Sequence, residues 1–144
     1  NVLDGLEVYN TQQEGVHFRT SSADNTIQNS YIHDTGKGSV TDQGFGEGLY
    51  IGNAVSYLLF HNWAGGKQDK SDRNQVLNNK IGPGVTAECI DIKEGSCCGV
   101  IKGNTFDGSG LSGQNSADSW IDVKGDSYDI EGNTGSHSLK DGFQ

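Results

Sequence analysis

A six-residue segment recurs five times along the chain, and it constrains the fold more than any other feature of the sequence. Each copy opens with an apolar residue; the copies are Leu3–Val8, Ile27–Ile32, Val76–Ile81, Ile101–Phe106 and Ile130–Gly135. The third position holds only Gly or Asn, the residues that most readily adopt a positive φ. We therefore expect a sharp bend in every copy, at Gly5, Asn29, Asn78, Gly103 and Gly132. The next position holds Asn79, Asn104 and Asn133 in the last three copies, where stacked amides would hydrogen-bond from coil to coil.

A second motif follows each copy and alternates apolar, polar and apolar residues. It occurs at Val16–Phe18, Leu49–Ile51, Ile90–Ile92 and Ile121–Val123, and begins once more at Phe143. Such alternation is typical of a β-strand with one buried face. The sequence therefore predicts one all-β solenoid domain over residues 1–144, with about five coils of three short strands each. Two insertions, residues 35–46 and 53–73, lengthen the loops on either side of Leu49–Ile51.

Composition excludes several classes of partner. The net charge of -9 disfavours nucleic acid and anionic membrane surfaces, and no apolar run is long enough to span a membrane. The three cysteines leave at least one thiol unpaired within the chain. We expect Cys89 to pair with Cys97 or Cys98, or all three to stay reduced.

Three motifs carry a resemblance to a known group of proteins. They are Asn-x-Ile before a Gly or Asn bend, Gly-Leu-Tyr-Ile-Gly at 48–52, and Ile-Lys-Gly-Asn-Thr-Phe at 101–106. Together they resemble the repeats of the pectate-lyase-like superfamily, which implies a right-handed parallel β-helix. The superfamily includes polysaccharide lyases, glycoside hydrolases, carbohydrate esterases and non-catalytic fibre or adhesin domains, so the resemblance leaves the activity open. Neither end of the chain carries a capping segment, and we expect a piece of a longer chain or end-to-end self-association.

One outer face of the solenoid is predicted to carry the chemistry. If the apolar residues of the second motif point inward, the residues between them form an outward row, namely His17, Tyr50, Asp91, Asp122 and Gln144. A second row holds Arg19, Gly52, Lys93 and Lys124, and a third holds Gly15, Gly48, Cys89, Trp120 and Gly142. Because neighbouring coils lie about 4.8 Å apart, Asp91 and Asp122 are expected side by side on the surface.

This face suits an acidic polysaccharide. Tyr50 and Trp120 would offer apolar platforms to a sugar, and His17 and Arg19 would hydrogen-bond to it. Elimination from a uronate polymer requires neutralisation of the substrate carboxylate and a base for the C5 proton. Asp91, Asp122 and Glu88 would hold a calcium ion for the first task, and Lys93 or Lys124 would perform the second. The leading prediction is a secreted polysaccharide lyase-like protein that acts by β-elimination.

Other interpretations of the same residues stay open. A glycoside hydrolase would use Asp91, Asp122 and Glu88 as its acid and base. A non-catalytic solenoid would bind glycans or assemble through its ends, and the Asp and Lys residues would then be ordinary surface ion pairs. The recurrence of Glu14, Glu47 and Glu88 suggests a structural role at a turn. The aromatic residues Tyr57, Phe60, His61 and Trp63 would form either a wall of a groove or an apolar flap.

Overall fold

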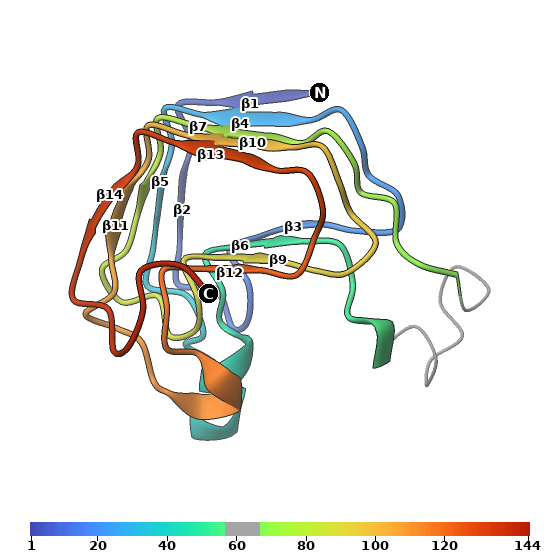
Figure 1. The fold of residues 1–144 in the computed structure, drawn as a ribbon. Coiled ribbons are helices and arrows are strands. Elements are labelled where there is room, and N and C mark those ends of the chain that lie inside the picture. Colours follow the sequence, from blue (N-terminus) through green and yellow to red (C-terminus); the bar gives the residue numbers. More distant parts are fainter. Residues whose placement is uncertain (57–66) are drawn as a thin grey trace.

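The chain folds into a parallel β-helix, as predicted (Figure 1). The computed structural model describes residues 1–56 and 67–144. Three parallel sheets run along it. Sheet A contains β1 (Val2–Asp4), β4 (Thr26–Gln28), β7 (Gln75–Leu77), β10 (Val100–Lys102) and β13 (Asp129–Glu131). Sheet B contains β2 (Glu7–Tyr9), β5 (Tyr31–His33), β8 (Lys80–Ile81), β11 (Thr105–Asp107) and β14 (Thr134–Ser136). Sheet C contains β3 (Val16–Phe18), β6 (Leu49–Ile51), β9 (Ile90–Ile92) and β12 (Ile121–Val123).

The chain passes from sheet A to sheet B through the predicted bend. The φ angles are 65° at Gly5, 50° at Asn29, 54° at Asn78, 67° at Gly103 and 64° at Gly132. Glycine adopts this left-handed conformation without a steric cost, and asparagine tolerates it better than most residues. The recurring Gly or Asn therefore allows the backbone to turn a corner within one residue in every coil.

Apolar side chains stack in rows inside the three sheets. Sheet A aligns Ile27 with Val76 and Ile101, sheet B aligns Ile32 with Ile81 and Phe106, and sheet C aligns Leu49 with Ile90 and Ile121. All of these side chains are at most 1% exposed. Because each residue sits directly above its counterpart, a small set of residues fills the whole core.

Asparagine amides also stack from coil to coil. The Asn79 side chain donates a hydrogen bond to Asn104 Oδ1 at 3.1 Å, and Asn104 donates to Asn133 Oδ1 at 2.9 Å. A second row of amides, which the sequence pattern did not reveal, joins Asn1, Asn25 and Asn74. In each row, amide oxygens also accept from the backbone, as Asn104 Oδ1 does from Asn79 N. We refer to Asn79, Asn104 and Asn133 as the amide row.

The cysteine pairing predicted from the sequence is wrong. Cys97 and Cys98 form a disulfide between adjacent residues, and Cys89 is a fully buried free thiol. Cys89 cannot reach its expected partners because it belongs to the apolar core together with Ile90. Its predicted place in an outward row is therefore also wrong: the chain turns a corner before β9, and two consecutive side chains point inward.

Two short 3-10 helices lie together at one edge of sheet C (Figure 1). They are η1 (Val40–Phe45), within the first insertion, and η3 (Gln114–Ser116), in the loop after β11. The Asn115 side chain donates to the Gly44 carbonyl at 3.1 Å, and Gln114 Nε2 donates to Gln43 Oε1 at 3.4 Å. Among the residues that the structure describes, no helix is long and apolar enough to cross a membrane.

Candidate functional site

The outer face of sheet C carries the predicted row of polar residues. Strand register places His17 beside Tyr50, Tyr50 beside Asp91, and Asp91 beside Asp122. The lysines that follow β9 and β12 continue the pairing, since Lys93 N donates to Ile51 O and Lys124 N donates to Ile92 O. The period of the sequence was sufficient to predict this alignment.

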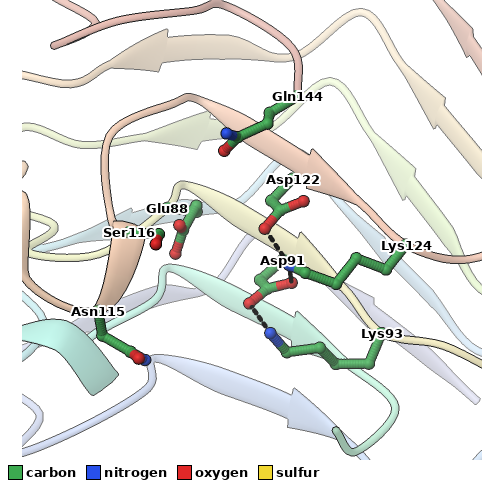
Figure 2. A pocket seen from close by; sticks show the side chains of 8 residues that line it. All are labelled: Glu88, Asp91, Lys93, Asn115, Ser116, Asp122, Lys124 and Gln144. Atoms are coloured by element: carbon green, nitrogen blue, oxygen red, sulfur yellow. Dashed lines mark hydrogen bonds and ion pairs between the residues drawn. The ribbon is translucent and has the colours of Figure 1, made fainter.

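Burial of the aspartates differs from the prediction. Asp91 is 3% exposed and Asp122 is 8% exposed, although both point away from the core. Lys93 Nζ lies 2.5 Å from Asp91 Oδ2, and Lys124 Nζ lies 3.5 Å from Asp91 Oδ1 and also pairs with Asp122 (Figure 2). The ion pairs exist, but their carboxylates lie beneath the lysine side chains rather than on an open surface.

Two glutamates join Asp91 in a buried group of carboxyls. Glu47 is 3% exposed and Glu88 is 4% exposed. One oxygen from each of Glu47, Glu88 and Asp91 lies within 4.8 Å of the others. Glu47 Oε2 and Asp91 Oδ1 have no hydrogen-bond partner within residues 1–56 and 67–144. We call these three residues the carboxyl cluster.

Burial changes the acidity of the cluster. It raises the pKa of Glu47 to about 8 and that of Glu88 to about 7, and the negative charge of Asp91 adds to both shifts. Burial also raises the pKa of Asp91, although Lys93 and Lys124 oppose that change. Burial alone would lower the pKa of Lys124, but Asp91 and Asp122 outweigh it and raise the pKa of this amine. Lys124 therefore stays a cation at neutral pH.

Tyr50 and His17 lie in contact next to the cluster. The His17 ring meets the Tyr50 ring edge-on, with 4.6 Å between centroids, and Lys93 Nζ lies 5.0 Å from the Tyr50 centroid. His17 Nε2 donates to the Gly52 carbonyl at 2.9 Å, which leaves Nδ1 facing Glu14 at 3.6 Å. Burial lowers the pKa of His17 and raises that of Tyr50. The imidazole is therefore neutral and the phenol protonated at neutral pH.

A groove runs over these side chains. Its larger cavity, of about 690 Å³, is lined by His17, Arg19, Phe45, Glu47, Tyr50 and Lys93, among others. A smaller cavity of about 460 Å³ is lined by Glu88, Asp91, Asp122 and Gln144, among others (Figure 2). Lys93, Lys124 and Asn115 line both cavities. The two lysines therefore stand where the two parts of the groove meet.

Trp120 lies away from the groove. Its ring covers Gly135, so that a Cβ on that glycine would lie 2.7 Å from the indole, and it packs against the core. Gly135 occupies the sheet B row that Phe106 fills in the preceding coil. The indole fills this missing apolar position, which explains why it lines neither cavity and provides no platform beside Tyr50.

Sequence reasoning overlooked several residues of the groove, among them Phe45, Asn115 and Glu47. Phe45 and Asn115 reach it only through η1 and η3, whose contact no periodic pattern indicates. Glu47 was predictable in part, because the recurrence of Glu14, Glu47 and Glu88 places a glutamate before each strand of sheet C. Asn53, Ala54 and Ser56 of the second insertion line the larger cavity, whereas the predicted wall residues Tyr57, Phe60, His61 and Trp63 lie outside the described residues.

The carboxyl cluster fits a cation better than the predicted calcium ligands do. Calcium takes several oxygen ligands, including carboxylates, and the converging oxygens come from Glu47, Glu88 and Asp91. Glu88 and Asp91 were predicted as ligands and belong to this cluster, whereas Asp122, also predicted, lies outside it; both aspartates pair with lysines. Glu47 Oε2, which is buried and has no partner in the described part of the chain, is the feature that a bound cation would satisfy.

The fold has a counterpart among solved structures. The chain resembles an alginate lyase. The crystal structure of that enzyme, from Paenibacillus sp. str. FPU-7, matches 93% of this chain with 45% sequence identity and a TM-score of 0.83. The chain spans 42% of the length of that enzyme. No family model matches the sequence, and a search of curated proteins found no match.

Proposed function

We propose that this β-helix is part of a polysaccharide lyase that cleaves an acidic polysaccharide, with alginate as the first candidate, by β-elimination. The observation that carries the proposal is the pair Lys93 and Lys124 over buried Asp91, in the middle of a groove. The similarity to an alginate lyase over 93% of the chain supports it. A cationic centre in a long groove is suited to a polymer that carries one carboxylate on each sugar.

The residues around this centre suggest a division of labour. Lys124, which stays charged, would bind the carboxylate of the uronate and so acidify its C5 proton. Lys93 would remove that proton after its own proton has moved to Asp91 Oδ2, 2.5 Å away. Burial raises the pKa of Asp91 and makes the carboxylate a better acceptor for it.

Tyr50 would complete the elimination. The bond from C4 to the glycosidic oxygen breaks while the C4=C5 double bond forms, and the leaving oxygen needs a proton. Burial raises the pKa of Tyr50, so the phenol still holds its proton at neutral pH and donates it at this step. The proton collected by Lys93 would later return to the phenolate through solvent; the amine lies over the face of the Tyr50 ring. His17 would orient Tyr50 through their edge-on contact.

Calcium remains part of the proposal. Glu47, Glu88 and the Asp91 oxygen that does not take the proton of Lys93 would hold it, and it would supply further positive charge for neutralising the substrate carboxylate. The proton transfers above use only the side chains of this chain. Release outside the cell would bring the enzyme to its substrate, and the disulfide between Cys97 and Cys98 is of the kind that persists in oxidising compartments.

The test is the formation of unsaturated uronate, followed by ultraviolet absorbance on alginate, pectate and a neutral glucan. We expect product from alginate and none from the glucan. A chelator arm measures how much of the rate depends on a divalent cation. Binding of alginate without any unsaturated product would favour the non-catalytic glycan-binding alternative, and reducing ends without a double bond would favour a hydrolase.

A further inference from the structure

We propose that Phe45 is the apolar platform of a sugar-binding subsite in the larger cavity, next to the elimination centre. The inference rests on the proposed function. It gives Phe45 the role of sugar platform that the sequence pattern had predicted for Trp120. Phe45 is 49% exposed and lines the same cavity as Tyr50 and Lys93. An exposed phenyl ring beside charged side chains in one groove is suited to the C–H face of a sugar ring.

The backbone on both sides of Phe45 is closely packed. A Cβ on Gly44 would lie 2.8 Å from Asn115 Cβ, and a Cβ on Gly46 would lie 2.5 Å from Gly36 Cα. The Gly44 carbonyl accepts from Asn115, and the Gly46 carbonyl accepts from Thr35 Oγ1 at 2.5 Å. Both glycines are buried while the phenyl ring between them is exposed. The ring is therefore held at the groove by its neighbours and not by core packing of its own.

The start of η1 is fixed as well. The Asp42 carboxylate accepts from the backbone N–H of Ser39 at 2.9 Å and from its hydroxyl at 2.7 Å. A side chain presented by such a fixed segment loses little conformational freedom on binding, which favours recognition of a ligand.

The occupant that fits is one uronate unit of the polymer. Its C–H face would rest on Phe45, while its carboxylate would face the cationic part of the same cavity, where Lys93 and Lys124 lie. The smaller cavity on the other side of these lysines is lined by Asn115, Ser116 and Gln144, and no aromatic residue of the described chain lines it. Sugar binding should therefore be stronger on the Phe45 side of the cleaved bond.

The chain provides a matched control on the same helix. Val40 is 73% exposed, also belongs to η1, and lines neither cavity. Neither Phe45→Ala nor Val40→Ala removes a buried contact of the core, so both variants should keep the thermal unfolding midpoint of the wild type. If Phe45→Ala lowers the unfolding midpoint, Phe45→Leu takes its place in the comparison.

The experiment compares wild type, Phe45→Ala, Phe45→Trp and Val40→Ala on alginate and on alginate oligosaccharides of defined length. We expect Phe45→Ala to raise KM about tenfold with little change in kcat, because the platform binds ground state and transition state alike. The lengths of its products should shift, since one end of the groove then binds more weakly. Phe45→Trp should retain the KM of the wild type, and Val40→Ala should match it throughout.

The outcomes separate this inference from the proposed function. If wild type releases unsaturated product and Phe45→Ala equals Val40→Ala in KM and product length, the subsite is overturned and the lyase stands. A loss of kcat alone in Phe45→Ala would also overturn it, because a platform acts through binding. If wild type neither binds nor cleaves any uronate polymer, the proposed function fails and the subsite fails with it.

Discussion

Two sets of polar side chains are largely withdrawn from solvent along this β-helix, the amide row inside the coils and the carboxyl cluster on sheet C. Amides both donate and accept, so Asn79, Asn104 and Asn133 satisfy one another and the neighbouring backbone. Carboxylates only accept when ionised, so Asp91 depends on Lys93 and Lys124, and Glu47 keeps a buried oxygen without a partner in the described part of the chain. The same stacking thus stabilises one set and destabilises the other.

The difference explains where function is expected. A satisfied row of amides contributes to folding and has no capacity left for a ligand. The acids of the carboxyl cluster have raised pKa values because they are buried, and they lie next to lysines and a groove. This combination is typical of sites that bind or transform a substrate. Substitutions in the two sets should therefore have different effects.

Replacing the amine above the cluster should produce the largest effect. Lys93→Ala removes the proposed base, so we expect kcat for release of unsaturated uronate to fall about 10²- to 10⁴-fold. Lys124→Ala should raise KM and also lower kcat, because that lysine is assigned both to binding the substrate carboxylate and to acidifying the C5 proton. Initial rates on alginate measure both. If both variants keep the activity of the wild type, the cationic centre has been assigned incorrectly.

Breaking the amide row should reduce stability. In Asn104→Ala, Asn79 and Asn133 lose their shared partner and buried backbone groups are left unsatisfied, at a cost of about 3 kcal/mol. Chemical denaturation measures the free energy of unfolding. Asn133→Ala, at the end of the row, should cost less. An Asn104→Ala variant as stable as wild type would show that the row contributes nothing.

Neutralising the cluster should increase stability at high pH. The pKa of Glu47 is about 8 in the folded protein and 4.5 in an unfolded chain, so the folded state holds the extra proton between these values. Stability therefore falls as pH rises through this window, and the loss is complete above about pH 8.

Glu47→Gln lacks this contribution, so it should match wild type near pH 4 and exceed it by up to about 5 kcal/mol at pH 9. Thermal unfolding with a chelator present, across that range, gives the comparison, and exposed Glu131→Gln is the control. If the stability of wild type and of Glu47→Gln changes equally with pH, the pKa of Glu47 is not raised in the folded protein.

An exposed ion pair should matter least. Lys102 and Glu131 pair on sheet A with about half of each side chain exposed. Solvent screens such a pair, so Lys102→Ala should leave both the denaturation midpoint and the activity unchanged. The same two measurements made on Lys93→Ala provide the contrast between an exposed and a buried lysine. A large loss in Lys102→Ala would mean that surface charge, rather than burial, sets the contribution.

Local rules were enough to predict much of this molecule. Positive φ at Gly103 or Asn78 depends only on which residues tolerate it, and the row from His17 to Asp122 depends only on the period of the coils. Lys93 was predicted beside Asp91 because residues two positions apart share a face of the sheet. Lys124 was predicted there because equivalent residues of adjacent coils lie next to each other.

The burial and direction of several side chains depended on contacts that do not repeat from coil to coil, so the sequence period could not predict them. Asp91 is buried because two lysines fold over it, and Phe45 reaches the groove because η1 packs on η3, about seventy residues further along the chain. Cys89 and Trp120 point inward because the chain turns before β9 and because Gly135 leaves space for an indole. The sequence alone determined the coil, its bends and its rows, since these repeat with local chemistry. Only the tertiary structure decided which acids have raised pKa values and which aromatic residue faces the groove. Both depend on contacts between loops that do not repeat from coil to coil.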